Sequence, residues 1–110
     1  MKEVKWNKNA QDLIRSLDRR TRIEIGTLLM MLQAGAVLTE PQSKPMKSIH
    51  SKAHELRIRD KNGIYRIIYV LIFSDLILIP HAFIKKTQKT SKKDIELSMK
   101  RLKEMLNENK

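Results

Sequence analysis

The chain has 110 residues, 41% of them hydrophobic, and contains no cysteine. This length is that of one ordinary domain, so we expect a single domain over residues 1–110. Without cysteine, disulfides and cysteine-ligated zinc are excluded. Lys and Arg number 23 against 12 Asp and Glu, and the resulting net charge of +11 favours a polyanionic partner.

No membrane or export segment is predicted. The longest apolar run, residues 67–73, is interrupted by Tyr69 and is far shorter than the roughly 20 residues that a membrane helix needs. The N-terminal sequence MKEVKWNKNAQD lacks the apolar segment of a secretory signal. We therefore expect a cytoplasmic protein with no membrane partner.

Two amphipathic helices are predicted near the N-terminus. Apolar residues at helical spacing predict the first over residues 10–17, with Asn9 as its N-cap. Asp18 begins the second helix, and Gly35 is a typical C-terminal stop. Gly26 lies inside this helix and costs up to about 1 kcal/mol relative to alanine, so we expect close helix packing there.

A polar connection and a meander of strands follow. Residues 39–52 are rich in proline, serine and lysine, with a short extra strand expected near residues 46–49. Three antiparallel strands are predicted after it, and Pro80 in the third indicates a β-bulge or an edge. The strands are residues 55–59, 64–73 and 76–84.

The C-terminal segment predicts a third helix. Ser91 is its N-cap, with Asp94 three residues later. Ile95, Met99 and Leu102 begin an apolar stripe that continues to Leu106.

The Asn62-Gly63 pair is typical of a two-residue hairpin turn and predicts a register for the first two strands. Arg59 then lies opposite Arg66. Because like charges across a ladder are destabilising, the pair indicates either an anion site or partial neutralisation by Glu55 and Asp60. In this register Leu56, Ile58, Ile67 and Tyr69 face the helices, and Arg57, Arg59 and Arg66 lie on the other face.

A lysine-rich segment follows the third strand. Lys85, Lys86, Gln88 and Lys89 precede a helix N-terminus, whose free N–H groups also favour anions. We expect these residues to extend the arginine face into one basic surface.

The histidines indicate no metal site. His50 and His54 are four residues apart, but no third ligand lies close to them in the sequence. His81 is interpreted either as a structural histidine or as an acid–base group. No cofactor is predicted.

Three segments resemble the signature of the RelE/ParE toxin superfamily, and more narrowly its HigB-like, phage-derived branch. They are ELRIR at residues 55–59, GIYRIIY at residues 63–69 and HAFIKKTQKT at residues 81–90. The last is the most specific, and the resemblance covers essentially the whole chain. It implies an α+β fold of the RelE-like microbial RNase type, with two N-terminal helices and a C-terminal helix packed on one face of a small, twisted antiparallel sheet.

The resemblance also implies a function: the toxin of a type II toxin-antitoxin system, a ribosome-dependent, metal-independent mRNA endoribonuclease that inhibits translation. Its implied partners are the ribosome, mRNA and a cognate helix-turn-helix antitoxin (HigA-like), through which alone it would contact operator DNA. Alternatives are a ParE-like DNA gyrase poison and a non-catalytic basic nucleic-acid-binding domain.

Roles for individual residues follow from the same resemblance. Arg59 and Arg66 would stabilise the transition state, and Lys85 or His81 would transfer protons. Several relatives use a tyrosine near the C-terminus, but no aromatic residue follows Phe83 here. The general base is therefore open among Lys85, His81 and a glutamate such as Glu55. Arg57, Lys86, Gln88 and Lys89 would bind nucleic acid.

Overall fold

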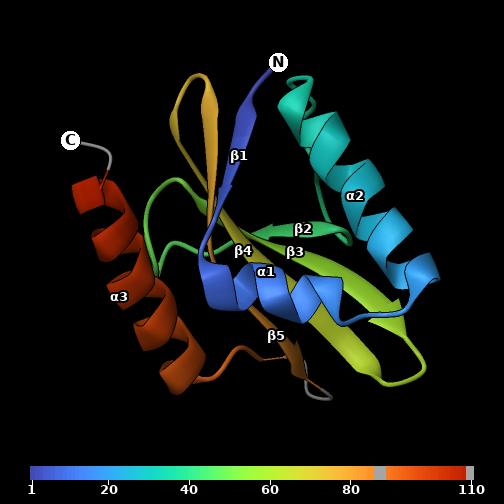
Figure 1. Ribbon diagram of the computed structural model, residues 1–110. Helices are drawn as coiled ribbons and strands as arrows, with labels where there is room; N and C mark the ends of the chain where they lie inside the picture. The colour runs from blue at the N-terminus through green and yellow to red at the C-terminus, as the bar shows by residue number, and fades with distance from the viewer. Residues whose placement is uncertain (86–88, 109–110) are drawn as a thin grey trace.

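The computed structural model describes residues 1–85 and 89–108. Within this part of the chain, five strands form one sheet in the order β1-β5-β4-β3-β2, and three helices pack on it (Figure 1). The fold is α+β, as predicted. The elements are β1 (Glu3–Trp6), α1 (Lys8–Arg15), α2 (Arg19–Gln33), β2 (Ser43–Pro45), β3 (Ala53–Asp60), β4 (Gly63–Phe73), β5 (Leu76–Lys85) and α3 (Lys92–Glu108).

The sheet is mixed rather than purely antiparallel because of β1, a strand that the sequence analysis missed. Glu3 pairs with Leu76 and Trp6 with Ile79, in parallel, whereas the other strand pairs are antiparallel. Trp6, expected at the start of the first helix, instead ends β1 and packs against the core as predicted. The extra strand expected near residues 46–49 is β2, slightly earlier in the chain.

The helix ends follow their capping residues. Asn7, not Asn9, caps α1: its side chain accepts a hydrogen bond from the Ala10 N–H at 3.2 Å. Asp18 caps α2 as predicted, and Gly35 has a φ of +95° just beyond its end. The packing expected at Gly26 is wrong, since a Cβ added there would meet nothing within 4 Å.

Helices cover both faces of the sheet, not one. The helices α1 and α2 pack on the face that carries Leu56, Ile58, Ile67 and Tyr69, as the register predicted. Leu102 and Met105 of α3 pack on the opposite face, the one that carries the arginines. In Figure 1, α2 and α3 accordingly lie on opposite sides of the sheet. On α3, the predicted stripe is wrong at Met99, which is 47% exposed, and Ser98 takes a buried position.

The β3–β4 hairpin turns one residue earlier than predicted. Asp60 pairs with Gly63, and the Asp60 carboxylate accepts a hydrogen bond from the Asn62 N–H at 2.7 Å. Gly63 has a φ of +142°, and a Cβ there would lie 3.0 Å from the Lys85 carbonyl oxygen. Arg66 therefore lies opposite Arg57, not Arg59. The two registers differ by two residues in their pairing, so the residues on each face are unchanged.

Pro80 marks a β-bulge, one of the two predicted alternatives. Ile68 pairs with His81 but Val70 with Leu78, so β5 contains one extra residue at this point. The other alternative is wrong, because β5 lies between β1 and β4 and is not an edge strand. The bulge begins where pairing with β1 ends, so the missing N–H of Pro80 interrupts neither ladder.

Candidate nucleic-acid interface

Strand pairing brings the predicted site residues that lie in strands onto the face that α3 covers. Arg59 and Lys85 both pair with Ile64, so they lie in one row across three strands. Moving two positions along each strand gives the next row, and because side chains alternate between faces, every row built in this way lies on the same face. Those rows are Arg57, Arg66 and Phe83, and then Glu55, Ile68 and His81.

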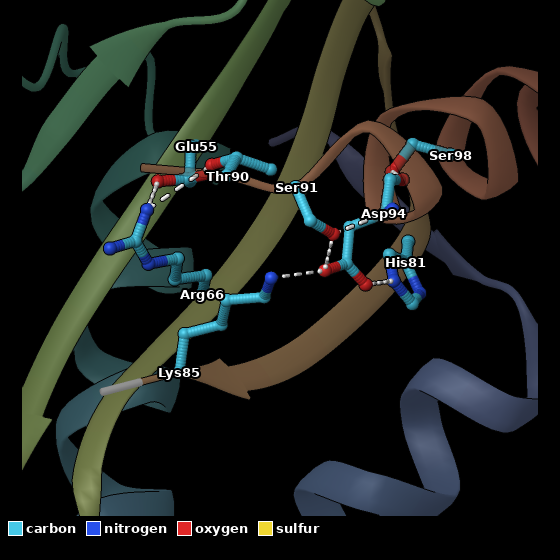
Figure 2. A network of polar contacts seen from close by, with 8 residues as sticks. All are labelled: Glu55, Arg66, His81, Lys85, Thr90, Ser91, Asp94 and Ser98. Carbon is cyan, nitrogen blue, oxygen red and sulfur yellow. Dashed lines mark hydrogen bonds and ion pairs between the residues drawn. The ribbon is translucent and has the colours of Figure 1, made fainter. Parts of the chain in front are cut away.

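Glu55 separates the two opposed arginines. Its carboxylate is fully buried and accepts hydrogen bonds from Arg57 Nε at 2.9 Å and from Arg66 Nη1 at 3.0 Å. The Thr90 hydroxyl donates to its other oxygen at 2.5 Å and accepts from Arg66 Nη1 at 3.1 Å. This Glu55 network ties β3 and β4 to the segment before α3, as Figure 2 shows. A carboxylate thus separates the cations, the partial neutralisation that the sequence left open.

Arg66 is not on an exposed basic surface, contrary to our expectation. Its side chain is fully buried, because α3 and Thr90 cover this face of the sheet. Arg66 and Glu55 form a buried ion pair, which has a structural role below the surface of the protein. The role of Arg66 in stabilising a transition state stays a prediction.

Asp94 organises a second network at the start of α3. Its carboxylate accepts hydrogen bonds from His81 Nε2 at 2.9 Å and from the Ser91 hydroxyl at 2.7 Å, and Lys85 Nζ lies 3.3 Å away (Figure 2). The Ser91 hydroxyl in turn accepts from the Asp94 N–H, which confirms the predicted cap. Burial raises the pKa of Asp94, but the hydrogen bonds from His81 and Ser91 outweigh it and lower that pKa overall.

His81 has both ring nitrogens engaged. Arg101 donates to Nδ1 at 2.9 Å, so Nδ1 is the acceptor and Nε2 carries the proton given to Asp94. Burial lowers the pKa of His81, and nearby Arg101 adds to this effect. The ring stacks on Phe83 and is only 6% exposed. This geometry favours the structural interpretation of His81 over the catalytic one.

A basic groove lies beside these networks. It consists of two hollows of about 430 and 410 Å³ that share Arg57 as a lining residue. Among the described residues, four cations and no acidic residue line the larger hollow, and two cations and Glu40 line the smaller one. The cations of the basic groove are Lys44, Lys47, Arg57 and Lys89 in the first hollow, and Arg57 with Arg59 in the second.

Arg57 is the central residue of the basic groove. Glu55 holds its Nε, and among the described residues nothing hydrogen-bonds to its two Nη groups. A guanidinium fixed at Nε with its outer edge available is suited to bidentate contact with a phosphate. The expected proximity of Arg57 and Lys89 is confirmed, while their role in binding stays a prediction.

Lys44 and Lys47 were missed as site residues. They lie in the connection that the sequence marked only as polar, although its lysines were visible. Pairing of β2 with β3 sets Lys44 opposite Glu55 and so brings this connection beside Arg57. Lys86 and Gln88, both predicted to bind nucleic acid, lie outside the described residues.

The described residues hold neither a cluster of metal ligands nor a membrane-spanning helix. They contain no group of three or more His, Cys, Asp or Glu side chains that could hold a metal ion. Among them, too, no helix is long and apolar enough to cross a membrane.

The model of a family described as phage-derived protein Gp49-like (DUF891) matches residues 12–103. No curated protein matches the chain. The matched segment includes every described residue of the basic groove and of the two buried networks.

Proposed function

The chain belongs to the Gp49-like family of phage-derived proteins, and from this membership and the basic groove we propose that it is the toxin of a type II toxin-antitoxin system. In this proposal it is a ribosome-dependent, metal-independent endoribonuclease that cuts mRNA. A cognate helix-turn-helix antitoxin neutralises it. The resemblance to the HigB-like branch of the RelE/ParE toxins supports the reaction and the partners.

The observation that carries the proposal is that every charged residue described in the lining of the larger hollow is a cation. Lys44, Lys47, Arg57 and Lys89 converge there without an acidic residue. Cations gathered without carboxylates attract a polyanion, and the phosphates of a nucleic acid backbone match this pattern. Met46 and Ile95 line the same hollow and offer apolar contact to a base or sugar.

The chemistry assigned to the groove is attack of a 2′-hydroxyl on the adjacent phosphate. This reaction needs proton transfer and cations that stabilise the extra charge of the transition state. Arg57 and Arg59 would supply those cations from β3, with Arg66 fixing Arg57 through Glu55.

Lys85 is the strongest candidate for proton transfer. Glu55 is fully buried and His81 has both nitrogens engaged, whereas the Lys85 side chain is 24% exposed. It also shares a row with Arg59, across Ile64. Its ammonium group would donate a proton to the leaving 5′-oxygen, while the proton of the attacking 2′-hydroxyl would pass to a solvent water as the new P–O bond forms.

The test is expression of the chain in bacteria, with growth and mRNA followed after induction. We expect growth arrest and discrete mRNA cuts by primer extension. Arg57→Gln with Arg59→Gln should abolish both, because the transition state loses its cations. Arg66→Ala is unsuitable for this test, since it removes the fully buried cation that pairs with Glu55 and risks unfolding.

A charge-matched control keeps the test specific. Lys100 and Lys103 are exposed on α3 and line neither hollow. Lys100→Gln with Lys103→Gln should therefore stay fully toxic. Intact mRNA with DNA breaks would indicate a gyrase poison instead. Bound but uncut RNA would indicate a non-catalytic binding domain.

A further inference from the structure

The outer face of α2 carries an apolar stripe that no described part of the chain covers. Ile23 is 56% exposed, Met30 62% and Met31 43%, and Val37, just beyond the helix, is 87% exposed. In Figure 1, α2 lies at the rim of the molecule, on the opposite side of the sheet from α3. None of these residues lines the basic groove. Large apolar side chains gathered in this way mark an interaction surface.

The stripe has the spacing of a helix–helix interface. Arg19, Ile23, Gly26 and Met30 follow one another at intervals of four, three and four residues, and so lie on one face of α2. A Cβ at Gly26 would meet nothing within 4 Å, so the surface is lowered between Ile23 and Met30. Glycine destabilises a helix interior, and no packing within the described chain requires it here. A depression flanked by two apolar side chains is suited to a side chain from a second helix.

The positive charge at one end of the stripe indicates that the partner helix carries acidic residues. Arg19 and Arg22 are exposed in the first turn of α2, and none of the ion pairs among the described residues involves either of them. Cations are unfavourable at a helix N-terminus, and the Asp18 carboxylate there is engaged as the N-cap, so carboxylates from a partner would relieve more of this cost. The overall charge of +11 would speed the approach of such a partner.

We propose that the outer face of α2 docks an amphipathic helix of a protein partner, with apolar residues over Ile23, Gly26 and Met30 and acidic residues beside Arg19 and Arg22. A nucleic acid fits this face less well, because it would leave Ile23 and Met30 uncovered. The docking face is separate from the basic groove and does not depend on the function proposed for that groove.

The test is selection of helical peptides from a randomised display library on the immobilised full chain. We expect the selected peptides to combine an apolar stripe with acidic residues at one end. Met30→Glu should weaken their binding by roughly tenfold or more, because it buries an unpaired charge. Arg19→Glu with Arg22→Glu should favour peptides in which the acidic residues are replaced by lysine.

Gly26→Ala separates docking from a structural role. It should raise the unfolding temperature, because alanine favours the helix, and yet weaken peptide binding, because it fills the depression. The matched control is Met99→Glu, because Met99 is also an exposed methionine but lies on α3. This variant should bind the selected peptides as tightly as the unaltered chain does. Three results would each overturn the proposal: no peptide selected, binding insensitive to Met30→Glu, or an RNA oligonucleotide that protects Arg19 and Arg22 while no peptide does.

Discussion

The two faces of the sheet are built from different chemistry. The face under α1 and α2 is closed by aliphatic and aromatic side chains such as Leu56, Ile67 and Tyr69. The face under α3 carries apolar contacts at one end and the buried Glu55 carboxylate at the other, beside the partly buried Asp94 carboxylate of α3. The basic groove lies beside the charged part only.

The two faces therefore contribute differently to stability and to the arrangement of the basic groove. Packing on the α1 and α2 face is mainly apolar and supplies stability, with one buried hydrogen bond between the hydroxyls of Tyr69 and Ser43. On the α3 face, Glu55 fixes Arg57 at the groove, and Asp94 fixes Lys85 and the start of α3. We therefore expect substitutions on the first face to change stability alone, and those on the second to change both stability and nucleic-acid binding.

The largest effect is expected from Glu55→Gln. The neutral amide leaves Arg66 buried without a counter-charge, which should cost about 3–5 kcal/mol of unfolding free energy, measured by urea denaturation. The double replacement Glu55→Leu with Arg66→Met should recover much of this loss, because apolar pairs of similar volume replace buried ion pairs well. A loss below about 1 kcal/mol for Glu55→Gln would show that the network does not hold this face together.

Removing cations from the basic groove should weaken RNA binding with little effect on stability. Lys44→Gln, Lys47→Gln and Lys89→Gln together should lower the slope of log affinity against log salt by about 2, at about 0.7 for each phosphate contact on a single strand. Fluorescence anisotropy with a labelled single-stranded RNA measures this slope. The same slope in the triple variant as in the unaltered chain would place the RNA elsewhere.

Ile67→Val probes the apolar face. Ile67 is fully buried, so loss of one methylene should reduce the unfolding free energy by about 0.5–1.5 kcal/mol. RNA affinity of the folded variant should be unchanged, since Ile67 lines neither hollow. A parallel fall in affinity would contradict the separation of the two faces.

The smallest effect concerns pH. Burial holds the pKa of His81 below its usual 6.5, so the folded chain prefers the neutral ring. The stability that this provides is complete above pH 6.5 and is lost as the pH falls through the lowered pKa. Thermal melts should therefore show a steeper fall in acid for the unaltered chain than for His81→Gln. Burial also lowers the pKa of His54, and the loss of stability that this causes in acid is the same in both proteins.

The faces of the hairpin could be predicted from sequence because they depend only on alternation along a strand. The register could not, because the Asp60 side chain bonds to Asn62 and moves the turn away from Asn62-Gly63. Burial of Arg66 was also beyond sequence reasoning: it depends on α3, whose contact with this face joins distant parts of the chain.

The site was predictable to a similar extent. Arg57 and Lys89 follow recognisable strand and helix signals, and the structure brings them together. Lys44 and Lys47 join them only because a three-residue strand, β2, pairs with β3. So short a strand, with proline at its end, has almost no pattern to detect.

The most direct test of the account is an NMR titration of the isotopically labelled chain with a short single-stranded RNA. We predict saturable chemical-shift changes at Lys44, Lys47, Arg57 and Lys89, with α2 unaffected. Changes confined to α2, or no saturable change at the basic groove, would contradict the central claim that this groove binds the RNA backbone.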